Sequence, residues 1–335
     1  MEEQTYLTRL PMENPQPKLR IITYMCPSHP VELYELILQY LEEETGCEAS
    51  LLYESRSPGQ LSDRLDPFTD DSADIGFSTA SAYVKLLDTQ NKYVELLPVT
   101  AVFDHPKKTE GVKGYYSDVI IHVDGRKRVK EFLDLRGCRL AYSDEDSLSA
   151  SKVILKTLKE LGENASFFGD TLRSGSHLNS IHMVLTKQAE AAAVDANTLA
   201  YNKKYLQDGG KDIQVLESIG PLPPYPIIVN NRIDGEHKGC LQCYFKKLRS
   251  PDNLQSRTTC TDKLLTPWYR VFLSKVDIQL VKKFFTAMEG ISSLSTKDHP
   301  PLDPILSQLN PVSPTSTLIL FSHQTYILQL VFDNL

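Results

Sequence analysis

Residues 133–158 read LDLRGCRLAYSDEDSLSASKVILKTL, and residues 174–200 read SGSHLNSIHMVLTKQAEAAAVDANTLA. In the first segment an apolar strand at 138–142 leads into a turn with three serines, Ser147, Ser149 and Ser151. Apolar residues then recur at helical spacing, so we expect a helix to begin near Ala150. Hydroxyls and backbone N–H groups at a helix start can bind an oxyanion, although capping of the helix is the more common role of such serines.

Three polar residues of the second segment add to this candidate site. His177 precedes a predicted helix at 178–186, either as a donor to a tetrahedral anion or as a surface or capping histidine. Asp195 and Asn197 end an apolar strand at 191–194, at the carboxyl edge where open α/β sheets bind ligands. Asp195 is expected to orient His177, to anchor a donor of the ligand, or to cap the next helix.

Alternating strands and helices predict the fold class. Apolar strands at 19–24, 49–53 and 73–77 alternate with helical patterns such as 31–45, which predicts an α/β protein with a parallel sheet covered by helices. The pattern restarts after residue 129, with a possible short strand at Phe167. Connections near 111–116 and 220–226 bracket this second set, so we expect two lobes, two hinge crossings and a ligand cleft between the lobes.

The expected domain limits follow from these connections. Residues 1–17 form a flexible arm, 18–113 with 227–290 form lobe 1, and 114–226 form lobe 2. Residues 234–262 are polar and read as an irregular insertion, with a helix expected at 276–288. Residues 291–335 hold a Pro-rich linker and a tail. The candidate binding residues of lobe 1 and the first crossing lie at or after strand ends, and they are Tyr24, Ser78, Thr79, Tyr83 and Tyr116.

Composition excludes several classes of partner. Of the 335 residues, 41% are hydrophobic and 24% charged, as in ordinary globular proteins, and the net charge of −7 disfavours nucleic acid and anionic membranes. The N-terminus has no apolar signal region and no long apolar span occurs, so a cytoplasmic location is expected. No cofactor is expected. A zinc site is only a weak alternative, because one C-x-x-C carries little weight; its ligands would be His237, Cys240, Cys243 and Cys260.

Residues 19–232 resemble the phosphonate/phosphate periplasmic-binding-protein family, which has the type II two-lobed fold. The resemblance rests on the segments quoted above and on ADIGFSTASAY (73–83), GYYSDVIIHVD (114–124) and GPLPPYPIIV (220–229). It implies that Ser147, Ser149 and His177 hold a phosphorus oxyanion. The acids that hold the amine of aminoalkylphosphonates in this family map to Asn197 and Tyr225, which disfavours an amino ligand, although the nearby Asp195 leaves that alternative open. Leu148 replaces the usual hydroxyl residue of the serine turn.

The function expected from these features is the binding of a small anionic ligand, a phosphonate or phosphate, by closure of the two lobes. Two alternatives stay open. One is an enzyme on the same scaffold that acts on a phosphorylated heterocycle, with Cys26 near His29 as its best nucleophile. The other is an interaction module that has lost its ligand, which the Leu148 replacement favours. No particular protein partner is indicated.

Overall fold

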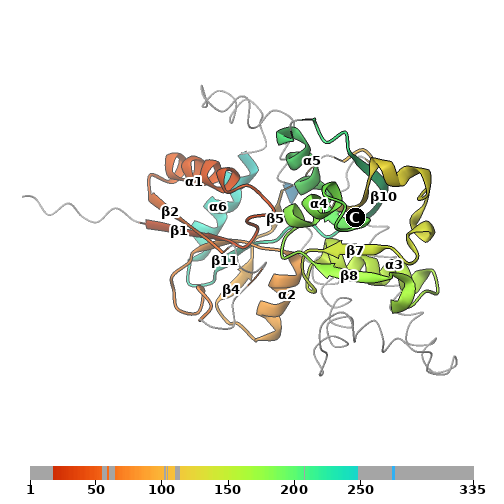
Figure 1. Ribbon diagram of the computed structural model, residues 1–335. Coiled ribbons are helices and arrows are strands. Elements are labelled where there is room, and N and C mark those ends of the chain that lie inside the picture. The colour runs from red at the N-terminus through yellow and green to blue at the C-terminus, as the bar shows by residue number, and fades with distance from the viewer. Residues whose placement is uncertain are drawn as a thin grey trace, which may run out of the picture.

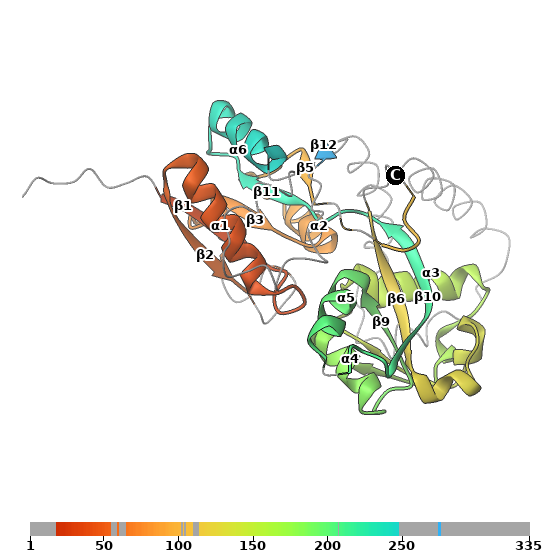
Figure 2. The ribbon, with the colours of Figure 1, turned by 90° about the horizontal axis from the view of Figure 1, so that it is seen from above.

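The computed structural model describes residues 18–54, 59, 65–101, 103, 105–109, 114–206, 208–247 and 274–275. They form two lobes, each with a five-stranded sheet and flanking helices (Figures 1 and 2). The two-lobed α/β fold expected from the sequence is confirmed. The expected arm at 1–17, the helix at 276–288 and the segment 291–335 lie outside the described residues.

The first sheet has the strand order β2-β1-β3-β11-β4. β1 pairs in parallel with β2 and β3, whereas β11 runs antiparallel to β3 and β4. The expected parallel pairing holds for β1, β2 and β3, but the sheet as a whole is mixed, because the chain enters β11 at the edge where β1 and β3 end. The strands are β1 (Lys18–Thr23), β2 (Glu48–Tyr53), β3 (Ile75–Phe77), β4 (Val94–Leu96) and β11 (Ile227–Asn230); β5 (Val99–Thr100) pairs separately with β12 (Ser274–Lys275).

Helices α1 (Val31–Thr45) and α6 (Gly235–Lys247) lie on one side of this sheet and α2 (Ala80–Asp88) on the other (Figure 1). The helix α6 corrects the expectation of an irregular segment at 234–262. Asp234 accepts the His237 N–H at 2.9 Å before the helix, and Leu241 and Phe245 bury the inner face. The polar and cysteine residues between them conceal this one-sided apolar pattern in the sequence.

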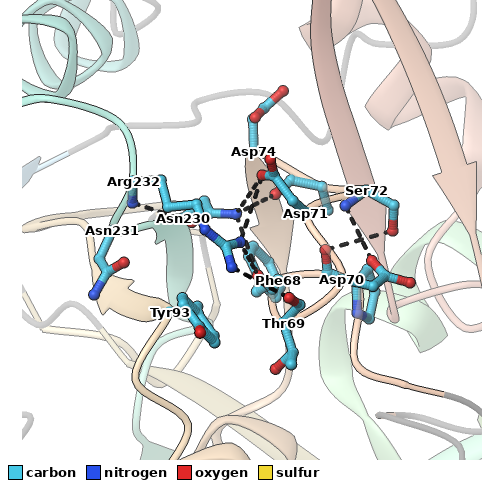
Figure 3. A network of polar contacts seen from close by, with 12 residues as sticks. Phe68, Thr69, Asp70, Asp71, Ser72, Asp74, Tyr93, Asn230, Asn231 and Arg232 are labelled. Carbon is cyan, nitrogen blue, oxygen red and sulfur yellow. Dashed lines mark hydrogen bonds and ion pairs between the residues drawn. The ribbon is translucent and has the colours of Figure 1, made fainter.

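A polar network fixes the loop 66–74 to the end of β11 (Figure 3). The Arg232 guanidinium lies 3.9 Å from the centre of the Tyr93 ring and donates to the Phe68 carbonyl at 2.7 Å. The Asn230 amide donates to the Ala73 carbonyl at 3.0 Å. Because these side chains satisfy loop carbonyls, the loop is held against the sheet that carries one wall of the cleft.

The second sheet has the order β10-β6-β9-β7-β8 and is also mixed, with β6 antiparallel to both β9 and β10. The possible strand at Phe167 is instead a short 3₁₀ turn, Ala165–Phe167, capped by Asn164, and the strand follows as β8. The strands are β6 (Tyr115–His122), β7 (Arg139–Tyr142), β8 (Asp170–Arg173), β9 (Ala191–Asp195) and β10 (Ile213–Leu222). The helices are α3 (Val153–Glu160), α4 (His177–Leu185) and α5 (Ala196–Tyr205), a π-helical turn (Leu148–Lys152) before α3, and 3₁₀ turns at Val123–Lys127 and Phe132–Leu135.

Both faces of the second sheet are buried. Ile120, Ala192 and Val194 pack in one cluster with residues of α4 and α5. Their neighbours Val119 and Ala193 face the opposite side, in the cluster that contains the apolar residues of α3. Successive side chains along the strands thus pack into two cores on opposite faces of the sheet. For this reason β9 is a continuous apolar run in the sequence.

The chain passes from the first lobe to the second between β5 and β6, and it returns through residues 223–226 between β10 and β11 (Figure 2). The Thr100 hydroxyl of β5 donates to the Tyr225 carbonyl at 2.8 Å, which joins β5 to the return segment. The strands of the first sheet lie within residues 18–96 and 227–230, and those of the second within 115–222. No helix in the described ranges has the length and apolar character needed to cross a bilayer.

Replacing Gly114 by Ala is expected to lower the free energy of unfolding by about 1–3 kcal/mol in urea denaturation. A Cβ at this position would overlap the Leu222 carbonyl oxygen and lie 2.9 Å from Pro221 Cβ. Gly239→Ala is the matched control, because it sits in the interior of α6 with nothing within 4 Å. That variant should gain about 0.5–1 kcal/mol. Unchanged stability of Gly114→Ala would contradict the close approach at the first crossing.

Candidate functional site

A cavity of about 60 Å³ lies between the two lobes. At roughly 10–15 Å³ for each water-sized group, it accommodates about four to six heavy atoms, which is the size of a tetrahedral oxyanion. Most of the residues expected to bind a ligand line it: Tyr24, Thr79, Ser147, Ser149, His177, Asp195 and Tyr225. Lobe 1 supplies the first two, and the rest come from lobe 2 and the return crossing.

The serine turn after β7 provides one wall. Ser147 is the N-cap, and its hydroxyl accepts the Ala150 N–H at 3.2 Å. Ser149 is buried, with its hydroxyl oxygen 3.4 Å from His177 Nε2. The N–H groups of Leu148 and Ser149 belong to the first turn and have no acceptor within the helix. Ser151 serves the turn itself, because its hydroxyl donates to the Asp144 carbonyl.

His177, the first residue of α4, is a neutral hydrogen-bond donor. Its Nδ1 accepts the backbone N–H of Asp195 at 3.4 Å. Since an amide N–H can only donate, the ring proton of the neutral imidazole belongs on Nε2, which faces Ser149. Burial lowers the pKa of His177 to about 4, an effect that the charge of Asp195 partly opposes and His29 reinforces. The site therefore presents an uncharged N–H at neutral pH.

Asp195 is part of the frame of the site. One carboxylate oxygen accepts the N–H groups of Asn197 at 2.8 Å and Thr198 at 3.4 Å, which caps α5. The other accepts the hydroxyl of Tyr225. The Asn197 amide donates to the same tyrosine oxygen at 3.0 Å, so Asn197 reaches the cavity only through Tyr225. Burial and the neighbouring carboxylate raise the pKa of Tyr225 well above its usual value.

Besides Asn197, three expected residues do not line the cavity formed by the described residues. Ser78 is buried, and its hydroxyl donates to the Thr79 carbonyl at 3.2 Å. Tyr83 is buried in α2, where burial raises its pKa to about 12. Tyr116 stacks on His105, with ring centres 4.2 Å apart. A position at a strand end therefore did not determine the direction of these side chains.

Two further residues belong to the site, His29 and Ser117, which the sequence places after the first strand and at the first crossing. His29, in the turn after β1, is 2% exposed, lines the cavity and lies edge-on to Tyr225. Ser117 pairs with Asp195 between β6 and β9, and its hydroxyl donates to the Ser149 carbonyl at 2.5 Å. The Cys-Pro-Ser-His-Pro turn directly after the first strand was the available signal for His29. Ser117 had only its place next to the first crossing.

The weak zinc alternative gains no support from the described residues. Cys240 and Cys243 are exposed on α6, and His237 Nδ1 lies 2.6 Å from Asp234 Oδ2. Within the part of the chain that the structure describes, no three His, Cys, Asp or Glu side chains gather as a metal site would require. Cys260 lies outside that part.

Comparisons with known proteins agree with this architecture. The family model for the periplasmic substrate-binding protein of phosphonate ABC transporters matches residues 20–259. A binding protein component of an ABC phosphonate transporter from Pseudomonas aeruginosa has a TM-score of 0.61 and 16% identity, over 88% of this chain and 97% of that chain. PhnD1 from Prochlorococcus marinus, in complex with methylphosphonate, has a TM-score of 0.61 and 14% identity, over 83% and 99%.

The aliphatic sulphonate-binding protein SsuA from Escherichia coli has a TM-score of 0.57 and 14% identity, over 89% of this chain and 94% of that chain. At these identities the structural matches establish the fold. No match was found among curated proteins. The cytoplasmic location expected from the N-terminal sequence is wrong, because the family matched over residues 20–259 consists of periplasmic substrate-binding proteins.

Acidification is expected to destabilise the protein through His177. Its pKa is about 4 in the folded protein against 6.5 for the free side chain, so the unfolded chain binds the proton more readily between these values. The free energy of unfolding should therefore fall as the pH decreases from about 6.5 to 4, by up to about 3 kcal/mol. Urea denaturation across this range measures the slope. His177→Gln should have a flatter profile, and an unchanged profile would contradict the neutral, buried imidazole.

Proposed function

Because this chain belongs to the family of periplasmic substrate-binding proteins of phosphonate ABC transporters, we propose that its cleft binds a small oxyanion of the phosphonate or phosphate class. The observation that carries the proposal is the convergence of Ser149 and His177 on one cavity, each at the start of a helix. Hydroxyl, imidazole and first-turn N–H donors suit an oxyanion without a counter-charge.

The geometry supports a ligand without an amino group. An ammonium group is held best by a carboxylate whose hydrogen-bonding capacity is largely unused. Asp195 already accepts two N–H groups of α5 and the hydroxyl of Tyr225. The other lining carboxylate, Asp144, accepts Arg173 at 2.6 Å. The tail of the ligand would instead meet Met25, Leu148 and the aromatic rings, so a short alkyl substituent fits better.

The proposed mechanism is closure of the two lobes over the ligand. Lobe 1 presents Tyr24, His29 and Thr79 to the cavity, while lobe 2 presents the serine turn and His177. A ligand held from both sides favours the closed arrangement by its differential affinity for it. In keeping with the family, we propose that the closed complex delivers its ligand to an ABC transporter.

We propose binding rather than catalysis. Cys26, the best nucleophile candidate of the sequence, is buried, and burial together with the charges of Glu32 and Glu35 raises the pKa of its thiol to about 11. The thiolate, which is the reactive form, is then scarce at neutral pH. His177 is held in one tautomer by the Asp195 N–H, which suits a hydrogen-bond donor better than a base.

Thermal unfolding with methylphosphonate or phosphate tests the proposal. A ligand at one hundred times its dissociation constant should add about 2.7 kcal/mol of stability. Ser149→Ala and His177→Ala each remove one hydrogen bond to a charged group, of about 1.5–3 kcal/mol, and should weaken affinity roughly 10- to 100-fold.

Asn164→Ala provides the control, because it removes a cap on the distant 3₁₀ turn. It should cost about 1 kcal/mol of stability or less and keep the ligand response. The proposed site is wrong if neither ligand stabilises the unaltered protein. It is also wrong if Ser149→Ala and His177→Ala respond to the ligands as the unaltered protein does.

A further inference from the structure

The charge of the cleft bears on the protonation state of the ligand. Among the described residues that line the cavity there is no lysine or arginine. Asp195 is 3% exposed and contributes a carboxylate to the wall, while Arg173 pairs with Asp144. In such surroundings Asp195 repels each additional negative charge on a ligand, and no lining cationic side chain offsets that repulsion, so a monoanion is favoured over a dianion.

His29 supplies an uncharged hydrogen-bond acceptor to the cleft. The serine turn and His177 offer donors, and both oxygens of Asp195 are already engaged. His29 lines the cavity and is 2% exposed. Neither ring nitrogen meets hydrogen-bond geometry with a described residue, and the Met25 carbonyl that interacts with the ring can take only its N–H. A neutral imidazole always carries one lone pair that can accept a proton donor. A buried acceptor of this kind gains when a ligand brings an O–H group.

We propose that the cleft selects the singly charged, protonated form of a phosphonate or phosphate group, with His29 accepting the hydrogen bond of the remaining P–OH. The inference rests on the proposed function and names the form in which its ligand binds. A sulphonate is also a monoanion but has no proton at neutral pH, so it leaves the His29 lone pair buried without a donor. His29 thereby becomes the residue that separates these two ligand classes.

The histidine and thiol groups around His29 do not change charge in the pH range over which the ligand is titrated. The groups that face it are His177 from α4, Asp195 from β9, Tyr225 from the return crossing and Cys26 from its own turn. Burial lowers the pKa of both histidines, to about 4 for His177, and raises that of the Cys26 thiol to about 11. A change of affinity between about pH 6 and 9 therefore reports on the ligand.

Calorimetric titration of the full chain with methylphosphonate and methanesulphonate tests the proposal, because the two ions share a shape and differ in the proton. Below the second pKa of methylphosphonate, it should bind at least about tenfold more tightly than methanesulphonate. Above that pKa its affinity should fall about tenfold for each pH unit, since only the protonated form binds. The affinity of methanesulphonate should stay flat.

His29→Phe fills the same aromatic surroundings without a ring nitrogen. It should remove the preference for methylphosphonate over methanesulphonate, whereas His177→Ala should weaken both ligands and keep the preference. A methylphosphonate affinity that is flat or rises with pH overturns the inference, as does an equal loss of both ligands in His29→Phe. If that variant does not fold, the pH profile of the unaltered protein decides. Failure of the unaltered protein to bind either ion refutes the proposed function itself.

Discussion

The carboxylate of Asp195 is the interaction on which the geometry of the site depends. It stands at the end of β9 and caps α5 through the N–H groups of Asn197 and Thr198. The same side chain accepts the hydroxyl of Tyr225, which fixes the return crossing against lobe 2. The backbone N–H of Asp195 sets the tautomer of His177. Asp195 thus positions the start of α5, the return crossing and the imidazole of His177.

Asp195 is an anion beside a proposed anion site, in a chain with a net charge of −7. The two are compatible because the charge of Asp195 is spread over hydrogen bonds from α5 and Tyr225, and the ligand would be met by other groups. Neutral donors at two helix starts hold an oxyanion by directed hydrogen bonds and aligned peptide dipoles. On the proposal above, selectivity would then depend on which ligand oxygens carry protons, as well as on the net charge.

The sequence predicted those features whose signals are local. Strand–helix alternation gave the α/β class, and the apolar run ending in Asp195 marked a strand whose end lies at the cavity. The serine turn likewise marked a helix start. By contrast, Tyr116 and His29 both follow predicted turns or crossings, yet only His29 lines the cavity. Tyr116 stacks on His105 instead, a contact of tertiary packing that no local pattern contains.

In the proposed closed arrangement, the ion pair between the lobes contributes little free energy. Lys85 of α2 forms an ion pair with Asp146, which directly precedes the serine turn, and so links lobe 1 to lobe 2. The lysine side chain is 61% exposed, and exposed pairs contribute only about 0–1 kcal/mol. Several hydrogen bonds from both lobes to one buried oxyanion contribute considerably more. On the proposed mechanism, the ligand would therefore contribute more to the closed state than this ion pair does.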